Sequence, residues 1–162
     1  MTTTLSEMAR EVGELLKARK EQVAVSESST GGLISAALLS IPGASAYFLG
    51  AGVIYTGPAR AAFLGLPPQL PTAIRSASEP YAALCAGTVR EHLGATWGLA
   101  ETGASGPTGN RYGDAAGHTC IAVAGPVESV LTLETASGER EANMWKFAQA
   151  ALDELLRCVK QA

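Results

Sequence analysis

The chain has 162 residues and a formal net charge of −3, from 12 lysines and arginines against 15 aspartates and glutamates. This length predicts one domain over residues 1–162, and the slight acidic excess argues against nucleic acid or an anionic membrane as a partner. Three cysteines at scattered spacings predict no disulfide framework, and the first residues lack the pattern of a secretion signal, so we expect a cytoplasmic protein.

Between residues 23 and 74 the only charged side chains are those of Glu27 and Arg60. Such a neutral stretch is typical of a membrane span or of a deeply buried half-domain. Glycines and prolines interrupt it, so no window offers the roughly 20 clean apolar residues of a membrane helix. We therefore interpret the stretch as buried, and we treat its two charges as candidates for function.

In chain order, a capping box of Thr4 and Glu7 and apolar residues at helical spacing predict a first helix over residues 5–19. A strand at 22–26, a helix over about 31–41, a strand at 51–55 and a short helix ending at residue 65 follow. A longer helix spans 78–93. Strands at 96–101, 119–124 and 129–135 come next, with a glycine-rich loop at 102–117, and the last helix covers about 144–159. This order predicts a three-layer α/β/α sandwich with a mixed sheet.

The first candidate motif is Ser26 to Gly32, placed between a predicted strand and a predicted helix. Hydroxyl groups and glycines at a helix N-terminus favour a bound phosphate or carboxylate, although a simply capped helix start explains the same pattern. Because a carboxylate repels phosphate, we expect Glu27 to pair with Arg60 or to hold a ligand hydroxyl or amide.

Two further motifs follow predicted strands. Tyr55 ends one strand and Arg60 lies one helical turn later, at the sheet edge where α/β proteins bind ligands. Arg60 is therefore either a buried ion-pair partner of Glu27 or a ligand clamp. The glycine-rich segment 101–109 is either a ligand loop or a mobile surface loop. The two histidines have no partners at metal-binding spacing, so no metal site is predicted.

Taken together, six segments resemble the CinA C-terminal domain family (competence/damage-inducible protein CinA) over about residues 5–160. The segment Ser26-Glu27-Ser28-Ser29-Thr30-Gly31-Gly32 is similar to the family's Ala-Glu-Ser-Cys-Thr-Gly-Gly. The other segments follow in matching order and spacing, and they begin at Pro42, Tyr55, Ser78, Thr102 and, more weakly, Gly138.

Single-domain members of this family are nicotinamide mononucleotide (NMN) deamidases, so the resemblance implies a metal-independent amidohydrolase that converts NMN and water to nicotinic acid mononucleotide and ammonia. In the family a serine attacks the carboxamide, and a lysine with a tyrosine activates the serine. Carried over by position, Ser45 is the nucleophile, Tyr55 is the tyrosine and Arg60 stands at the lysine position. The implied substrate-binding residues are Glu27, Ser28, Thr30, Gly31, Gly32, Thr102, Gly103 and Arg140. We expect an NMN-like nucleotide as ligand, no cofactor, no nucleic-acid or membrane partner, and a homo-oligomer.

Arginine at the lysine position is the main departure from the family, since arginine keeps its proton in proteins and cannot act as a base. Arg60 could instead polarise Tyr55 towards the phenolate, which would take the serine proton. Loss of a positioned general base typically lowers a rate by about 10²–10⁴. Two alternatives to an active amidase therefore stay open: a catalytically silent nucleotide-binding or regulatory domain, and a purely structural, oligomer-forming protein.

Overall fold

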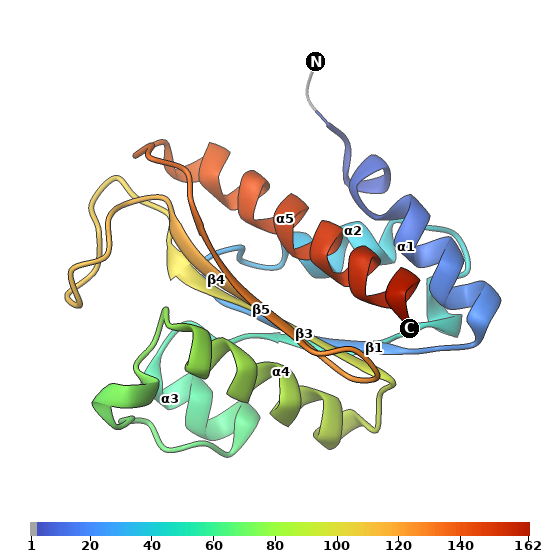
Figure 1. The fold of residues 1–162 in the computed structure, drawn as a ribbon, viewed down its shortest axis with the longest axis horizontal. Helices are drawn as coiled ribbons and strands as arrows, with labels where there is room; N and C mark the ends of the chain where they lie inside the picture. Colours follow the sequence, from blue (N-terminus) through green and yellow to red (C-terminus); the bar gives the residue numbers. More distant parts are fainter. Residues whose placement is uncertain (1–2) are drawn as a thin grey trace.

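A computed structural model describes residues 3–162 and contains a five-stranded mixed sheet in the order β2-β1-β3-β4-β5 (Figure 1). The strands are β1 (Val23–Glu27), β2 (Phe48–Val53), β3 (Trp97–Ala104), β4 (His118–Ala124) and β5 (Ser129–Glu134). Strands β2 and β3 both pair with β1 in parallel, whereas β3, β4 and β5 pair antiparallel. The predicted mixed sheet, with an antiparallel hairpin at its C-terminal side, is confirmed.

Helices cover both faces of the sheet and complete the three predicted layers (Figure 1). On one face lie α1 (Leu5–Arg19), α2 (Leu33–Leu39) and α5 (Arg140–Gln161). On the other face lie α4 (Glu79–Leu93) and the short α3 (Gly57–Ala59), which continues as a π-helical segment over Arg60–Leu64. No helix within residues 3–162 is long and apolar enough to cross a bilayer.

Alternation along the strands separates two cores. Val25 and Leu99 point into the core beneath α1, α2 and α5, whereas Ala24 and Ala100 point towards α4. The α4 face uses small residues because the helix approaches closely: a Cβ on Gly98 would lie only 2.1 Å from the carbonyl oxygen of Ala86. The short distance between layers explains why this chain is rich in alanine and glycine.

Three local predictions differ from the structure. The strand predicted at 51–55 is β2 at 48–53, so Tyr55 lies beyond its end. The predicted loop at 102–117 begins later, because β3 extends to Ala104 and includes Thr102. The neutral stretch is only partly buried: β2 is an edge strand with alternating burial, and Phe63 is 68% exposed. Because β2 lies at the edge of the sheet, its outward-facing side chains stay exposed. The composition of the stretch does not show that this strand lies at an edge.

Candidate functional site

The backbone N–H groups at the N-terminus of α2 donate to a carboxylate of the same chain, that of Glu27. Glu27, at the end of β1, is buried, and its Oε1 accepts hydrogen bonds from the Gly32 and Ile34 backbone N–H groups at 3.0 and 3.1 Å and from Thr30 Oγ1 at 2.7 Å. Its Oε2 accepts from the Ser35 backbone N–H at 2.8 Å. The negative charge also complements the helix dipole. The anion-binding role predicted for this helix start is therefore taken by Glu27 itself, and the predicted pairing of Glu27 with Arg60 is wrong.

A second buried carboxylate, Glu101 on β3, organises the segment between β1 and α2. It accepts hydrogen bonds from the backbone N–H groups of Ser28 at 3.1 Å and Thr30 at 2.9 Å, and from Thr119 Oγ1 at 2.8 Å. The Ser29 hydroxyl also donates to Glu101 Oε2 in a short contact. Parallel pairing of β1 with β3 brings these groups together, so this arrangement holds the Ser29 oxygen in a defined orientation.

Ser29 opens onto a cavity of about 260 Å³ that we call the inner pocket. Tyr55, beyond the end of β2, and Arg140, at the start of α5, face the same space. Arg140 Nη2 donates to the Tyr55 hydroxyl at 3.3 Å, and Arg140 Nη1 donates to the carbonyl oxygen of Gly106. The remaining lining comes from Gly103, Ala104, Ser105, Gly106, Thr108, Gly109 and Asn110.

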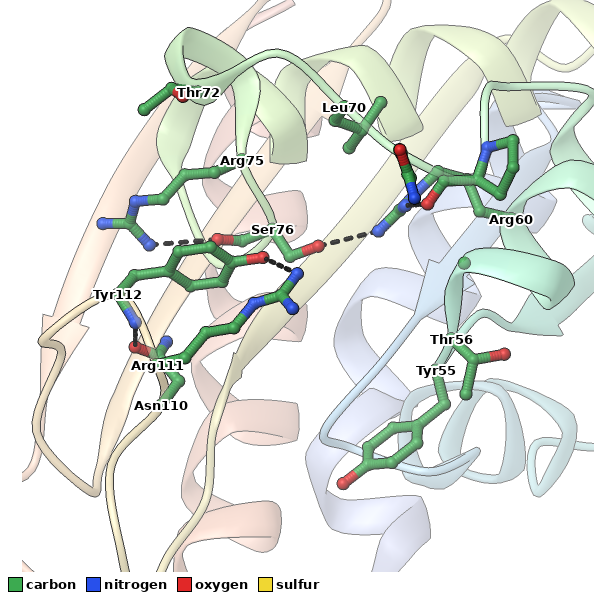
Figure 2. Close-up of a pocket in the computed structure, with 13 residues that line it drawn as sticks. Tyr55, Thr56, Arg60, Leu70, Thr72, Arg75, Ser76, Asn110, Arg111 and Tyr112 are labelled. Carbon is green, nitrogen blue, oxygen red and sulfur yellow. Dashed lines mark hydrogen bonds between the residues drawn. The ribbon is translucent and has the colours of Figure 1, made fainter.

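A larger cavity of about 780 Å³ adjoins the inner pocket, and we call it the arginine cavity (Figure 2). Tyr55 and Asn110 line both spaces. Three arginines reach the larger cavity, and none of its lining residues is acidic: Tyr55, Thr56, Gly57, Arg60, Pro68, Gln69, Leu70, Thr72, Arg75, Ser76, Asn110, Arg111 and Tyr112.

Arg60 is held by neutral partners. Its Nε donates to the Tyr81 hydroxyl at 2.9 Å, Nη1 to the carbonyl oxygen of Pro68 at 2.8 Å and Nη2 to Ser76 Oγ at 2.7 Å. Burial raises the pKa of Tyr81 to about 12, so this phenol stays protonated. No hydrogen bond joins Arg60 to Tyr55, whose hydroxyl points away from the guanidinium in Figure 2. The predicted polarisation of Tyr55 by Arg60 is therefore not seen, and Arg140 contacts Tyr55 instead.

The predicted nucleophile Ser45 lies before β2, at the end of the strand opposite to Tyr55 and Arg60. It belongs to a short 3₁₀ turn, Ala44–Ala46, that precedes the strand, whereas Tyr55 and Arg60 follow the strand. Six extended residues separate the two ends by about 20 Å, at roughly 3.3 Å per residue. Ser45 is exposed and lines neither the inner pocket nor the arginine cavity. The expectation that Ser45 meets Tyr55 and Arg60 within the chain is wrong.

Of the other predicted residues, Arg140 and Gly103 line the inner pocket. Gly103 also has a packing role, because a Cβ there would lie 2.4 Å from the carbonyl oxygen of His118. Thr102 accepts a hydrogen bond from the Ala77 backbone N–H at 3.1 Å and lines neither cavity. Ser28, Thr30, Gly31 and Gly32 also line neither cavity, and they shape the turn before α2.

The sequence alone names neither Ser29 and Glu101 nor most residues that line the arginine cavity as site residues. Ser29 and Glu101 belong to two of the candidate motifs, but no sequence signal links one to the other. Arg75, Asn110 and Arg111 come from irregular segments, whose side-chain directions depend on tertiary contacts. Among residues 3–162 no group of three or more His, Cys, Asp or Glu side chains is placed to hold a metal ion.

Arg75 is oriented by a carboxylate behind the cavity wall. Its Nη1 lies 2.7 Å from Asp114 Oδ2, and the Asn110 side-chain amide also donates to Asp114, at 2.8 Å. Burial tends to raise the pKa of Asp114, but the hydrogen bonds from Arg75 and Asn110 outweigh burial and lower it. His118 Nε2 lies 3.6 Å from the same carboxylate. The chain thus fixes one wall of the arginine cavity with a network of charges.

His118 should titrate above its ordinary pKa of 6.5 in the folded protein. Burial, the largest single influence, lowers the pKa, but hydrogen bonds to Glu134 Oε1 at 2.5 Å and to the Ala77 carbonyl oxygen at 2.8 Å together raise it. Both ring nitrogens face acceptors, an arrangement that favours the imidazolium. His118 therefore contributes stability that is fully present below pH 6.5 and is lost as the pH rises through the raised pKa. NMR titration checks this result, and Glu134→Gln should lower the pKa; an unchanged pKa in that variant would contradict the assignment.

Comparison with known proteins places the chain in a family. The family model of the CinA C-terminal domain matches residues 5–159. The chain is 42% identical over 149 residues to a CinA-like protein of Desulfosudis oleivorans and 36% identical over 153 residues to one of Synechocystis. These alignments cover 91% and 93% of this chain but 36% and 37% of the relatives, so the chain spans about a third of their length.

Solved structures agree with this fold over most of the chain. A CinA superfamily protein of Escherichia coli superimposes with a TM-score of 0.86 at 25% identity, covering 96% of this chain and 90% of the other. A competence/damage-inducible protein of Agrobacterium tumefaciens superimposes with a TM-score of 0.85 at 27% identity, covering 95% and 94%. The arrangement of three layers around a five-stranded sheet is thus shared with these proteins.

Proposed function

Because the chain belongs to the CinA C-terminal domain family, we propose that it hydrolyses the carboxamide of NMN to nicotinic acid mononucleotide and ammonia. One observation carries this proposal. The Ser29 hydroxyl, bonded to the buried Glu101 carboxylate, opens onto the same pocket as the contacting pair Tyr55 and Arg140. Hydrolysis of an amide by a serine needs a nucleophile, a proton acceptor and a donor to the carbonyl oxygen, and this pocket offers a candidate for each.

In this proposal Ser29 takes the role that the family resemblance assigned to Ser45. Its Oγ attacks the carboxamide carbon while the hydroxyl proton passes to Glu101, which already accepts that proton in a hydrogen bond. The tetrahedral intermediate then breaks its C–N bond, and the leaving nitrogen takes up the proton and departs as ammonia. Attack by water on the resulting ester restores the serine.

Tyr55 and Arg140 provide the second half of the proposed chemistry. Arg140 donates to the Tyr55 oxygen, which leaves the phenolic O–H free to donate into the inner pocket. A donor placed there would stabilise the negative charge that develops on the carboxamide oxygen during attack. The arginine also keeps this rim of the pocket cationic, which suits a phosphorylated substrate.

The direct test is incubation of the purified chain with NMN, with ammonia and nicotinic acid mononucleotide measured together. The proposal expects both products in equal amounts, at a rate that rises in proportion to enzyme concentration. Arg140→Gln, which removes the contact to Tyr55, should lower kcat/KM. Production of ammonia at the buffer rate, with NMN shown by calorimetry to be bound, would overturn the amidase.

A catalytically silent nucleotide-binding domain is the second candidate, and one observation favours it. The position at which the family has its lysine is occupied by Arg60, which is held by neutral partners and, as an arginine, keeps its proton and cannot act as the base. Calorimetric binding of NMN and nicotinic acid mononucleotide without turnover would support this candidate. Turnover of NMN would contradict it.

A further inference from the structure

The arginines that line the arginine cavity outnumber the carboxylates that contact them. Within residues 3–162, Arg75 forms an ion pair with the carboxylate of Asp114. In the same part of the chain no carboxylate oxygen lies within 4 Å of the side-chain nitrogens of Arg60 or Arg111. Arg60 is only 7% exposed, and three of its five N–H groups are bonded to neutral acceptors. A buried cation without a counter-charge is unfavourable. The cavity is therefore suited to receive an anion.

The cations are spread along the cavity and do not converge on one point. Ser76 stands between two of them: its Oγ accepts from Arg60 at 2.7 Å, and its carbonyl oxygen accepts from Arg75 at 3.0 Å. The Tyr112 ring then separates Arg75 from Arg111, whose guanidinium carbons lie 4.9 and 5.0 Å from the ring centre (Figure 2). In the view of Figure 2 the Arg111 guanidinium lies between those of Arg75 and Arg60, so the three charged groups form a row across the cavity.

One or two guanidinium groups are enough to bind a single phosphate in the bidentate manner. A row of three therefore suits a longer anion. The volume of about 780 Å³ also lies in the range of sites that hold cofactor-sized ligands. Because Tyr55 and Asn110 line both cavities, one ligand can extend from the inner pocket into the arginine cavity.

We propose that the arginine cavity is a diphosphate subsite, and that the preferred ligand of this chain is a pyrophosphate-bridged pyridine dinucleotide, not a mononucleotide. The nicotinamide end of this ligand rests on the proposed function, whereas the diphosphate end rests on the row of arginines alone. Arg60 accordingly acts as a phosphate-binding group at the position where the family resemblance implies a catalytic lysine.

Calorimetry with the intact chain tests the subsite. Nicotinamide adenine dinucleotide should bind about tenfold or more tightly than NMN, and inorganic pyrophosphate about tenfold more tightly than inorganic phosphate, as one added set of charge-assisted contacts implies. Arg111→Gln should reduce both preferences by about tenfold. Arg111 is exposed, so this variant is expected to fold. Arg10→Gln, the same change at an exposed position on α1, should preserve both preferences.

Equal affinities of the chain for NMN and the dinucleotide would contradict the proposed diphosphate subsite. An Arg111→Gln variant that lowers the affinities for NMN and for the dinucleotide by the same factor would also contradict it. Failure of the proposed amidase appears differently, as absent ammonia release. If neither nucleotide binds, the pyrophosphate measurements decide: a preference over phosphate that Arg111→Gln removes supports the subsite, and the lack of that preference overturns it.

Discussion

Replacement of Ser29 by alanine should lower the rate of ammonia release from NMN by about 100-fold or more, whereas Ser45→Ala should leave the rate within about twofold of the unaltered chain. The reason is placement. Ser29 opens onto the inner pocket beside Tyr55, and Ser45 is exposed before the opposite end of β2. Initial rates of ammonia release at saturating NMN provide the measurement.

The two serine variants form a matched pair, since each removes one hydroxyl oxygen. Ser29→Ala should fold, because Glu101 keeps its hydrogen bonds from Ser28, Thr30 and Thr119. Circular dichroism should confirm this. The opposite outcome, loss of activity in Ser45→Ala with activity kept in Ser29→Ala, would return the nucleophile to Ser45 and contradict the assignment made from the structure.

A cysteine variant separates the chemical role of Ser29 from a packing role. Ser29→Cys keeps a nucleophile at the position where the family motif has cysteine, so we expect measurable turnover that iodoacetamide abolishes and NMN protects. The three native cysteines, Cys85, Cys120 and Cys158, are buried, and burial raises the pKa of each thiol. The unaltered chain should therefore resist the same treatment.

Replacement of Glu27 by alanine should lower the free energy of unfolding by about 3 kcal/mol or more. The change removes the acceptor for the Gly32, Ile34 and Ser35 backbone N–H groups and for the Thr30 hydroxyl. Each buried donor left without a partner is unfavourable by about 1–3 kcal/mol, although relaxation and entering water recover part of this sum. Urea unfolding, followed by the fluorescence of the buried Trp97, provides the measurement.

Two companion variants sharpen the Glu27 experiment. Glu27→Gln keeps one acceptor oxygen and should fall between the alanine variant and the unaltered chain. Glu128→Ala removes an exposed carboxylate and should change the free energy of unfolding by no more than about 0.5 kcal/mol. If Glu27→Ala instead preserves stability and weakens NMN binding, Glu27 is a ligand-binding residue and its assignment as the cap of α2 is wrong.

Much of the architecture could be predicted because it rests on local signals. Apolar spacing and the Thr4 capping box placed α1 correctly, and the confirmed capping interaction shows why. The apolar repeat predicts the start of α5 four residues after its actual start at Arg140, because the first turn of the helix is polar. The end of β3 was placed early, since threonine, glycine and alanine after Glu101 also suit a loop.

The candidate site was predicted only in part, for a different physical reason. Tyr55 and Arg140 both line the inner pocket, but they are 85 residues apart in the chain and meet through tertiary packing alone. Glu27 and Arg60 were the only charges in a neutral stretch, which suggested that they pair with each other. The fold places them in separate networks: Glu27 caps α2, and Arg60 lines the arginine cavity.

By itself the sequence determined the family, the three-layer order and the segments that surround the site, because periodicity and motif spacing are properties of neighbouring residues. Only the tertiary structure decided which groups meet. The parallel pairing of β1 with β3 joins Ser29 to Glu101 across 72 positions of the chain, and the length of β2 separates Ser45 from Tyr55. Such encounters depend on strand order and register, which no single segment encodes.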